Sequence, residues 1–237
     1  MLKSIFNLAG KVVLITGFAG IQGPEHVKAF ESAGAKVVAT DIKGTAIILD
    51  VTSPNSIKQA VKKIIDQHGR IDVLINNAGA TGKHANDWDQ IIKVNLTGTY
   101  NCCQIVGNAM EEGSIINVSS IYGLVGPDFS IYQNAEYAGK AMGVPAGYAA
   151  SKGGIIALTK YFASLYAPKI RVNCVTPGGI YDNQDETFVK KYSSKTMLTR
   201  MAKKNEVSGA LLYLASEVSS YVTGTNIVID GGLTARA

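Results

Sequence analysis

The sequence is poor in cysteine and in charge, and it contains no long hydrophobic run. Its three cysteines, Cys102, Cys103 and Cys174, are an odd number without metal-ligand spacing, so we expect neither a disulfide framework nor a metal site. Buried thiols in a reducing compartment fit this usage, and we expect a cytoplasmic protein. No apolar run reaches the roughly 18 residues that span a membrane, and residues 1–7 are too short for a signal peptide. We therefore expect no membrane association.

Charged residues account for 17% of the chain and hydrophobic residues for 46%. The chain can thus bury a large core and does not have the composition of a disordered protein. The formal net charge of +5 is mild, and the lysines are dispersed. We interpret them as solvated helix faces and expect no nucleic-acid partner. The three histidines, His26, His68 and His84, are also scattered, and we expect each at the surface.

Short apolar runs alternate with segments of helical periodicity along the chain. Continuous aliphatic runs are typical of strands buried on both faces of a parallel sheet, with helices as crossovers. No linker, composition shift or repeat divides the chain. We predict an α/β fold, a single doubly wound parallel-sheet domain over residues 1–237, with about seven strands and helices on both faces. The expected strands are 11–16, 35–40, 46–49, 71–75, 114–118, 170–175 and 226–229, and the expected helices are 24–33, one beginning at 53–54, 87–110, 148–166 and 206–214.

Residues that could carry chemistry follow the ends of five expected strands. They are Gly17, Asp41, Asn76, Ser120 and Pro177. In a doubly wound sheet, ligands bind outside the carboxyl ends of the strands. The coincidence therefore predicts a binding site along that edge of the sheet.

The first of these strand ends has the features of a nucleotide site. Gly17, Gly20 and Gly23 lie between the first strand and the first helix, where glycines let the backbone approach a pyrophosphate at the helix N-terminus. Asp41 ends the second strand, 24 residues after Gly17. A carboxylate there accepts hydrogen bonds from both ribose hydroxyls and repels a 2′-phosphate, which favours NAD over NADP. Lys43 lies close enough in sequence to leave NADP possible.

Two further strand ends have both a binding and a structural interpretation. Asp50 could bind the adenine edge or could hold a turn. The run Asn76-Asn77-Ala78-Gly79 could line the floor of the cofactor site, or its amides could pin neighbouring backbone.

Tyr148 and Lys152 are four residues apart on an expected helix, so their side chains share one face. An ammonium beside a phenol favours the phenolate, and we expect Lys152 to lower the pKa of Tyr148 towards neutrality. Alone, the pair also fits an amphipathic helix with a surface lysine. The other motifs of the chain favour the catalytic interpretation.

Together these residues resemble the short-chain dehydrogenase/reductase family, from about Leu8 to Gly232, in its single-domain branch. The matching motifs include Thr16-Gly17, Asn95, Ser120, and Pro177-Gly178 in the correct order. The resemblance implies a Rossmann domain that binds NAD, with NADP possible. It places the cofactor on Gly17, Gly20, Ile21, Gln22, Gly23, Asp41, Asp50, Val51, Asn77, Ala78, Gly79, Tyr148, Lys152, Pro177 and Gly178.

The resemblance also implies catalytic roles. Tyr148 would be the general acid/base at the substrate oxygen, and Lys152 would lower its pKa and hold the nicotinamide ribose. Ser120 would orient the substrate oxygen, with Ser119 as the alternative. Asn95 would brace the site and help a water relay reach Lys152.

Two features depart from the usual family pattern. The glycine spacing places Ile21 where the middle glycine is expected, as in nucleotide-sugar epimerases and dehydratases, but only 85 residues follow Lys152. That is too few for their substrate domain, so we interpret the spacing as a local variant. Ser120 and Tyr148 are 28 residues apart, about twice the usual separation. We expect residues 122–145 to form an insertion that acts as a substrate lid or rim, beside a substrate loop at 180–203.

The polar and aromatic insertion favours a hydroxylated substrate, so we predict an oxidoreductase that interconverts a secondary alcohol and a ketone, plausibly on a sugar or sugar derivative. The insertion also resembles a bacterial subgroup associated with surface-sugar or flagellin-glycan biosynthesis. The alternatives are a 3-ketoacyl-(acyl carrier protein) reductase and a non-catalytic NAD-binding redox sensor. The family resemblance further suggests a homotetramer or dimer, with the helices at 87–110 and 148–166 at its interfaces.

Overall fold

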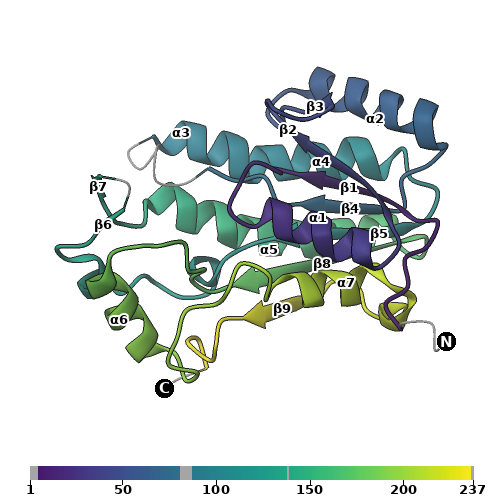
Figure 1. Cartoon of the computed structure of the whole chain (residues 1–237). Helices are drawn as coiled ribbons and strands as arrows, with labels where there is room; N and C mark the ends of the chain where they lie inside the picture. Colours follow the sequence, from purple (N-terminus) through teal and green to yellow (C-terminus); the bar gives the residue numbers. More distant parts are fainter. Residues whose placement is uncertain (1–4, 81–86, 138, 236–237) are drawn as a thin grey trace.

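The fold is built on one parallel sheet. The computed structural model describes residues 5–80, 87–137 and 139–235. Within them, seven parallel strands form a sheet of order β3-β2-β1-β4-β5-β8-β9 (Figure 1). This confirms the predicted α/β doubly wound fold. The strands are β1 Val12–Thr16, β2 Lys36–Asp41, β3 Ile47–Ile48, β4 Val73–Asn76, β5 Gly113–Val118, β8 Ile170–Pro177 and β9 Asn226–Ile229.

Helices cover both faces of the sheet. One hydrophobic core joins α2 (Pro54–His68), α4 (Gly98–Gly107) and α5 (Ala146–Tyr166) to one face. The other core joins α1 (Gly23–Ser32) and α7 (Ser208–Ala215) to the opposite face. Because β1 is buried along its whole length, its side chains can alternate between the two cores, which explains the continuous apolar run.

The order of the strands creates a switch point between β1 and β4. The chain builds outwards from β1 to β2 and β3, and then returns to add β4, β5, β8 and β9 on the other side. Crossovers therefore leave β1 and β4 in opposite directions, and the crevice at their carboxyl ends is where doubly wound sheets bind ligands.

A third hydrophobic cluster lies away from the main sheet. It joins the segment 121–145 to the segment 180–203 through buried Ile131, Phe188, Tyr192 and Met201. We call these two segments the edge module. Figure 1 shows its helix and hairpin together at one end of the molecule, far from the N-terminus. The module contains short 3-10 turns at Ile121–Gly123 and Phe129–Tyr132, the antiparallel strands β6 (Glu136–Tyr137) and β7 (Lys140–Ala141), and helix α6 (Glu186–Lys195).

Helix α6 was not expected from the sequence, for which we predicted only a substrate loop at residues 180–203. Asp185 begins the helix by accepting a hydrogen bond from the Phe188 amide. Phe188 and Tyr192 lie one turn apart and pack into the edge module. The capping aspartate and this spaced aromatic pair were the available signals.

The expected continuous helix over 87–110 was wrong in its interior. The structure has α3 at Trp88–Ile91, a π-helical segment at Ile92–Thr97, and α4 at Gly98–Gly107. Apolar periodicity does not distinguish an α-helix from a short π-helical segment, because the two differ by a single hydrogen-bond shift.

His26 is buried and was wrongly expected at the surface. Its side chain lies between α1 and α7, and its Nδ1 pairs with Ser208 Oγ at 2.9 Å. Burial lowers the pKa of His26 to about 4, so the ring is neutral at neutral pH. His68 is partly exposed, and His84 lies outside the described residues.

Candidate active site

The glycine-rich turn after β1 is held against the end of β4 by Asn77. Its Nδ2 donates to the Thr16 and Gly17 carbonyls at 3.1 and 3.0 Å. Gly17 has a φ of 73°, and a Cβ there would lie within clashing distance of the Ala78 backbone. Only glycine combines this conformation with this close approach. Asn77 and Ala78 thus shape the turn that the sequence assigned to the cofactor.

The N-terminus of α1 faces out of this turn without a side-chain cap. Gln22 precedes the helix, and no side-chain hydrogen bond satisfies the first amides. The buried Nε2 of Gln22 has no hydrogen-bond partner among the described residues. A Cβ at Gly23 would clash with the Phe18 carbonyl, so the turn requires glycine there. Unpaired amides, an unpaired side-chain donor and a helix dipole together fit an anionic pyrophosphate.

Asp41 ends β2 beside this turn, as predicted. Its Oδ2 accepts a hydrogen bond from the Ala19 amide at 2.9 Å, and its Oδ1 accepts one from the Ile42 amide at 2.7 Å. These contacts orient the carboxylate, and each oxygen keeps a further lone pair for a ribose hydroxyl. Asp41 therefore also helps to hold the glycine turn, a role that sequence reasoning missed.

Asp50 and Val51 follow β3, which pairs with the end of β2 at Asp41. Asp50 Oδ1 accepts hydrogen bonds from the Thr52 amide and hydroxyl, both at 2.8 Å. The turn role that we weighed for Asp50 is therefore present in the structure. Val51 is buried, and its carbonyl accepts a hydrogen bond from Asn101 in α4.

Lys152 is a buried ammonium at the end of β5. Its Nζ donates to the Val118 carbonyl at 2.8 Å, and only 5% of the residue is exposed. Ser119 Oγ donates to the Lys152 carbonyl, also at 2.8 Å. Burial lowers the pKa of Lys152 to about 8, so at neutral pH the side chain still carries its charge. Because Ser119 is engaged with the backbone of α5, Ser120 is the serine available at the site.

Tyr148 lies one helical turn before Lys152 and is half-buried. The Lys152 Nζ lies 5.6 Å from the centre of the Tyr148 ring. Burial raises the pKa of Tyr148, and a hydrogen bond with the Ser120 hydroxyl lowers it in part. The expectation that Lys152 lowers this pKa was wrong, because Lys152 is directed at Val118 and burial dominates. Tyr148 is therefore a protonated phenol at neutral pH, with Ser120 next to it.

Asn95 lies in the π-helical segment and joins three parts of the site. Its Oδ1 accepts a hydrogen bond from the Ala80 amide at 2.6 Å, and its Nδ2 donates to the Ala80 carbonyl at 3.1 Å and to Ser151 Oγ at 3.2 Å. Gly79 lies close to both the Asn95 amide and the Lys152 ammonium. Asn95 therefore braces the end of the 76–79 run against α5, and π-helical segments frequently occur at such sites.

Asn76 has the structural role that we weighed. Its Nδ2 donates to Asn117 Oδ1 at 2.8 Å and to Cys103 Sγ at 3.3 Å, inside the core. Asn117 in turn donates to Thr159 in α5. This buried network joins β4, β5 and the two helices below them.

The end of β8 contacts the edge module. The Gly178 amide donates to the Ile229 carbonyl at 2.9 Å. The next amide, that of Gly179, donates to the Tyr192 hydroxyl of α6 at 2.5 Å. Pro177 and Gly178 thus lie where the main sheet meets α6, on the same edge as the other strand ends.

Two residues near Ser120, Tyr122 and Gly123, were missed by sequence reasoning. The Tyr122 amide donates to Ser120 Oγ at 3.3 Å, and the Tyr122 hydroxyl is hydrogen-bonded to that of Tyr132 from the insertion. A Cβ at Gly123 would clash with the Lys152 backbone, so the turn after Ser120 crosses α5 in close contact. Only the proximity of Tyr122 and Gly123 to Ser120 in sequence could have indicated them.

Among residues 5–80, 87–137 and 139–235, no group of three or more His, Cys, Asp or Glu side chains is arranged to hold a metal ion. The helices of this part of the chain are too short or too polar to cross a membrane.

Comparison with protein families finds a match over residues 19–234 to the family model described as Enoyl-(Acyl carrier protein) reductase. The 3-oxoacyl-[acyl-carrier-protein] reductase FabG of Thermotoga maritima is 40% identical, over 96% of this chain and 99% of that protein.

Two solved structures share the fold and the chain length. A short chain dehydrogenase from Leptospira borgpetersenii with bound NAD+ is 35% identical, with a TM-score of 0.89, over 99% of this chain and 97% of that one. A gluconate 5-dehydrogenase from Burkholderia cenocepacia in complex with NADP and tartrate is 28% identical, with a TM-score of 0.83, over 100% of both chains.

The buried charge of Lys152 predicts a specific dependence of stability on pH. The folded pKa of about 8 lies below the ordinary lysine pKa of 10.5, so between these values the unfolded chain binds more protons and stability rises with pH. We expect the free energy of unfolding to increase by about 3 kcal/mol more in the wild type than in Lys152→Met from pH 8 to pH 10.5. Urea unfolding at several pH values measures this difference. Equal slopes for the two proteins would contradict the depressed pKa.

Proposed function

Since the chain belongs to the short-chain dehydrogenase/reductase family, whose members are oxidoreductases acting on CH–OH groups, we propose that Tyr148, Ser120, Lys152 and Asn95 form its catalytic set. The observation that carries this proposal is the position of the protonated Tyr148 phenol next to Ser120, with the buried Lys152 ammonium 5.6 Å from the centre of the phenol ring. A phenol and a hydroxyl that converge on one point are what a carbonyl oxygen requires to accept a proton.

The cofactor would lie along the carboxyl ends of the strands. The turn from Gly17 to Gly23 and the Gln22 side chain would hold its pyrophosphate, and Asp41 its adenosine ribose. Asp50 and Val51 would face the adenine, and the Asn77–Gly79 run, Pro177 and Gly178 the nicotinamide half. When bound, the cofactor supplies or accepts the hydride.

The protein's own part in the reaction is the movement of a proton. In the reducing direction, the Tyr148 Oη gives its proton to the substrate oxygen, and in the oxidising direction it takes that proton back. Ser120 Oγ orients the oxygen and stabilises its developing charge. With the cofactor in place, a Lys152 N–H that Val118 does not use would bind the nicotinamide ribose, and the ammonium would then favour the Tyr148 phenolate. A water held near Asn95 would link Lys152 to solvent.

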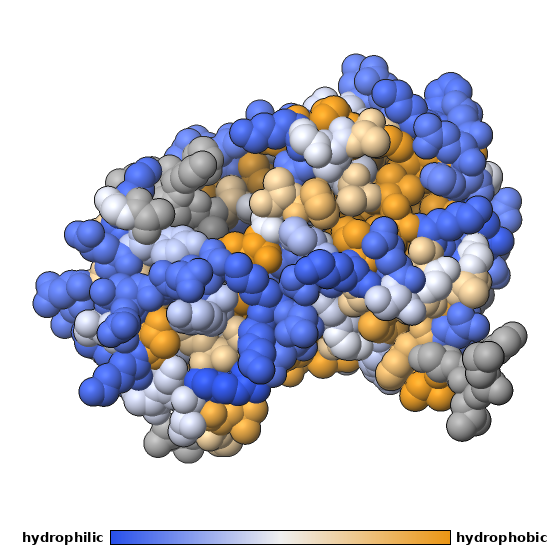
Figure 2. Space-filling model, viewed as in Figure 1, coloured by the Kyte–Doolittle hydropathy of each residue, from blue (hydrophilic) through white to orange (hydrophobic). Residues whose placement is uncertain are grey.

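For the substrate we propose a secondary alcohol or ketone that carries hydroxyl groups, such as a sugar derivative. The edge module would supply the substrate side of the site, on the same domain as the cofactor. The surface over its helix and hairpin is mainly hydrophilic, with smaller hydrophobic patches (Figure 2). The similarity to a gluconate 5-dehydrogenase supports this class. A link to surface-sugar biosynthesis and a cytoplasmic location stay predictions.

A second candidate is reduction of a 3-oxoacyl thioester. The 40% identity to a 3-oxoacyl-[acyl-carrier-protein] reductase supports it directly. The chemistry at Tyr148 would be the same, because both substrates present a ketone. The two candidates differ in the part of the substrate beyond the reacting carbon, which carries hydroxyl groups in the first and is an acyl thioester in the second.

Tyr148→Phe tests the catalytic assignment. We expect kcat to fall by about 10²–10⁴ because the general acid is lost, while binding of the reduced cofactor, followed by its fluorescence, stays within a factor of about two. The assay uses keto-sugars, acetoacetyl thioesters and simple ketones. The matched control is Tyr161→Phe, an exposed phenol on the same helix. Full activity of Tyr148→Phe would refute the assignment.

Asp41→Asn tests the preference for NAD. The amide keeps an acceptor for the Ala19 or Ile42 amide but loses the negative charge that opposes a 2′-phosphate. We expect the ratio of the Kd for NADPH to the Kd for NADH to fall about tenfold, equivalent to roughly 1.4 kcal/mol. Asp66→Asn, at an exposed position on α2, is the control. If the wild type already binds NADPH more tightly, the proposed preference is wrong.

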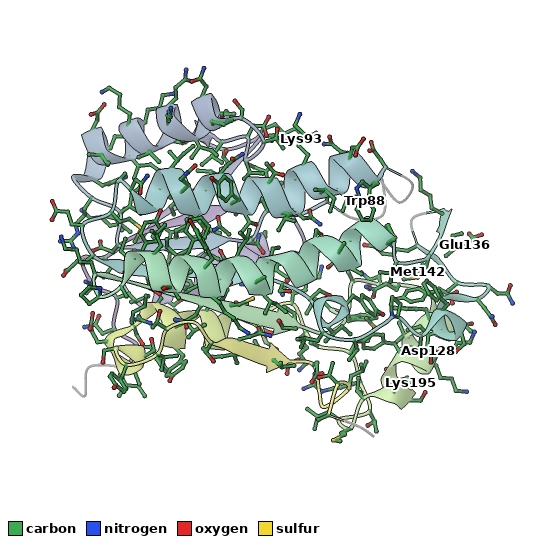
Figure 3. The ribbon with its side chains drawn as sticks, turned by 180° about the vertical axis from the view of Figure 1, so that it is seen from behind. Trp88, Lys93, Asp128, Glu136, Met142 and Lys195 are labelled. Atoms are coloured by element: carbon green, nitrogen blue, oxygen red, sulfur yellow. The ribbon has the colours of Figure 1, made fainter. Side chains whose placement is uncertain are left out.

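We further propose that the chain forms a homotetramer or dimer through α4 and α5. These helices lie side by side (Figure 3). On α4 the exposed fraction of Tyr100 is 38%, and on α5 those of Tyr161 and Leu165 are 59% and 54%. Large, mainly apolar side chains exposed on two adjacent helices suit a protein interface.

Leu165→Glu should shift the protein to a smaller species in light scattering, because a carboxylate would be buried at the interface. Val218→Glu, at a similarly exposed apolar position outside these helices, should leave the mass unchanged. A monomeric wild type would contradict the proposal.

A further inference from the structure

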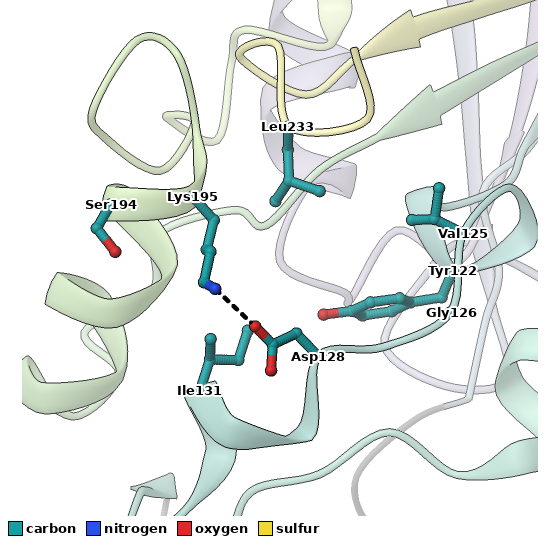
Figure 4. Close-up of a pocket in the computed structure, with 8 residues that line it drawn as sticks. All are labelled: Tyr122, Val125, Gly126, Asp128, Ile131, Ser194, Lys195 and Leu233. Atoms are coloured by element: carbon teal, nitrogen blue, oxygen red, sulfur yellow. Dashed lines mark ion pairs between the residues drawn. The ribbon is translucent and has the colours of Figure 1, made fainter. Parts of the chain in front are cut away.

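A cavity of about 450 Å³ lies within the edge module (Figure 4). Its walls come from the segment after Ser120, from the end of α6 and from the chain near the C-terminus. Val125, Ile131 and Leu233 form an apolar part of the wall. Asp128 and Lys195 form a charged part, and Figure 3 shows both at the end of the molecule that carries the edge module.

Asp128 and Lys195 form an ion pair across this cavity, with 2.8 Å between Oδ2 and Nζ. The other carboxylate oxygen, Oδ1, accepts hydrogen bonds from the Ser130 amide and hydroxyl at 3.0 and 2.6 Å. Hydrogen bonds from Lys195 and Ser130 lower the pKa of Asp128 to about 2, so the carboxylate is ionised at neutral pH. Both side chains are about half-exposed, at 51% for Lys195 and 43% for Asp128. The pair is therefore oriented by the protein and still accessible to a ligand.

Tyr122 connects this pair to the candidate catalytic site. Its amide donates to Ser120 Oγ, and its ring lines the cavity with the hydroxyl directed towards Asp128 (Figure 4). Tyr122 therefore belongs both to the surroundings of Ser120 and to the cavity that Asp128 and Lys195 line.

We propose, on the basis of the proposed alcohol–ketone chemistry, that this cavity binds the hydroxylated end of the substrate through Asp128 and Lys195. An ion pair presents an acceptor and a donor side by side, so one ligand hydroxyl donates to Asp128 while a neighbouring hydroxyl accepts from Lys195. The Lys195 ammonium has three hydrogens, and the bond to Asp128 uses one. Because the charges of the pair cancel, this part of the cavity suits hydroxyl groups of the substrate better than a charged group. The apolar wall packs against the C–H groups of that end of the substrate.

The competing explanation is that the ion pair only fastens the insertion to α6. Lys191, one helical turn before Lys195, does fasten it, since its Nζ donates to the Ser130 and Gln133 carbonyls at 3.3 and 3.1 Å. Lys191 does not line the cavity. Removing the ammonium of Lys191 or that of Lys195 would loosen the contact between the insertion and α6, but only the loss of Lys195 would remove a group that binds substrate. Lys191→Met is therefore a matched control for Lys195→Met.

The test uses two five-carbon 2-ketones, D-xylulose and 2-pentanone, which differ in their hydroxyl groups. Reduction by the full-length protein with NADH is followed by cofactor absorbance. We expect Lys195→Met and Asp128→Asn each to lower the ratio of kcat/KM for D-xylulose to that for 2-pentanone by about tenfold. The loss should be in KM for D-xylulose rather than in kcat, because the contact is remote from the reacting carbon. Lys191→Met should leave the ratio unchanged.

Three results would overturn the inference: equal effects of Lys195→Met and Lys191→Met, an unchanged ratio in all variants, or a wild type that reduces only 2-pentanone. In the last case the proposed function still stands if the turnover depends on Tyr148. If no ketone is reduced, the proposed function fails, and calorimetric titration of xylitol into the NADH complex of Tyr148→Phe decides the inference separately. A Kd for xylitol that rises about tenfold with Lys195→Met supports the subsite, and no binding or an unchanged Kd refutes it.

Discussion

The joint between β5 and α5 is the constraint on which the candidate active site depends. Lys152 Nζ donates to the Val118 carbonyl, and Ser119 Oγ donates to the Lys152 carbonyl. The first bond runs from the helix to the strand and the second from the residue after the strand to the helix, so together they hold α5 against the end of β5. Tyr148 is placed one turn earlier on that helix, and Ser120 is the next residue after the strand. The joint therefore determines that the phenol and the serine hydroxyl meet. Burying the ammonium costs free energy, as its lowered pKa shows. Such a cost is expected where stability is exchanged for chemistry.

The parallel sheet adds the second requirement, because it brings the carboxyl ends of β1, β4, β5 and β8 to one edge. At this edge, several side chains form hydrogen bonds with the backbone of neighbouring loops. Asn77 holds the glycine turn, Asn95 holds Ala80, and Asp41 holds Ala19. Each contact fixes a loop next to a place where the cofactor would lie. The resulting site is preorganised, which reduces the ordering that binding requires.

Most of the sheet and much of the site could be predicted from local signals in the sequence. Buried strands show as continuous apolar runs, and their parallel order places Ser120 on the same edge as the glycine turn. The spacing of Tyr148 and Lys152 places them on one face of a helix. Other features depend on packing between distant segments. The π-helical geometry at Asn95 arises where its segment packs on α5. The pairing of Asp128 with Lys195 joins residues 67 positions apart, and neither residue belongs to a motif. The pKa of Tyr148 is raised by burial, and the spacing of Tyr148 and Lys152 in the sequence does not specify how deeply the phenol is buried.

The most direct test of the account is a crystal structure of the protein with NADH and a slowly reacting hydroxylated ketone. The account predicts the ketone oxygen within hydrogen-bond distance, about 2.6–3.2 Å, of both Tyr148 Oη and Ser120 Oγ. It also predicts that Lys152 Nζ donates a hydrogen bond to the nicotinamide ribose. A ketone oxygen bound away from Tyr148, or a cofactor bound away from the carboxyl ends of the strands, would contradict it.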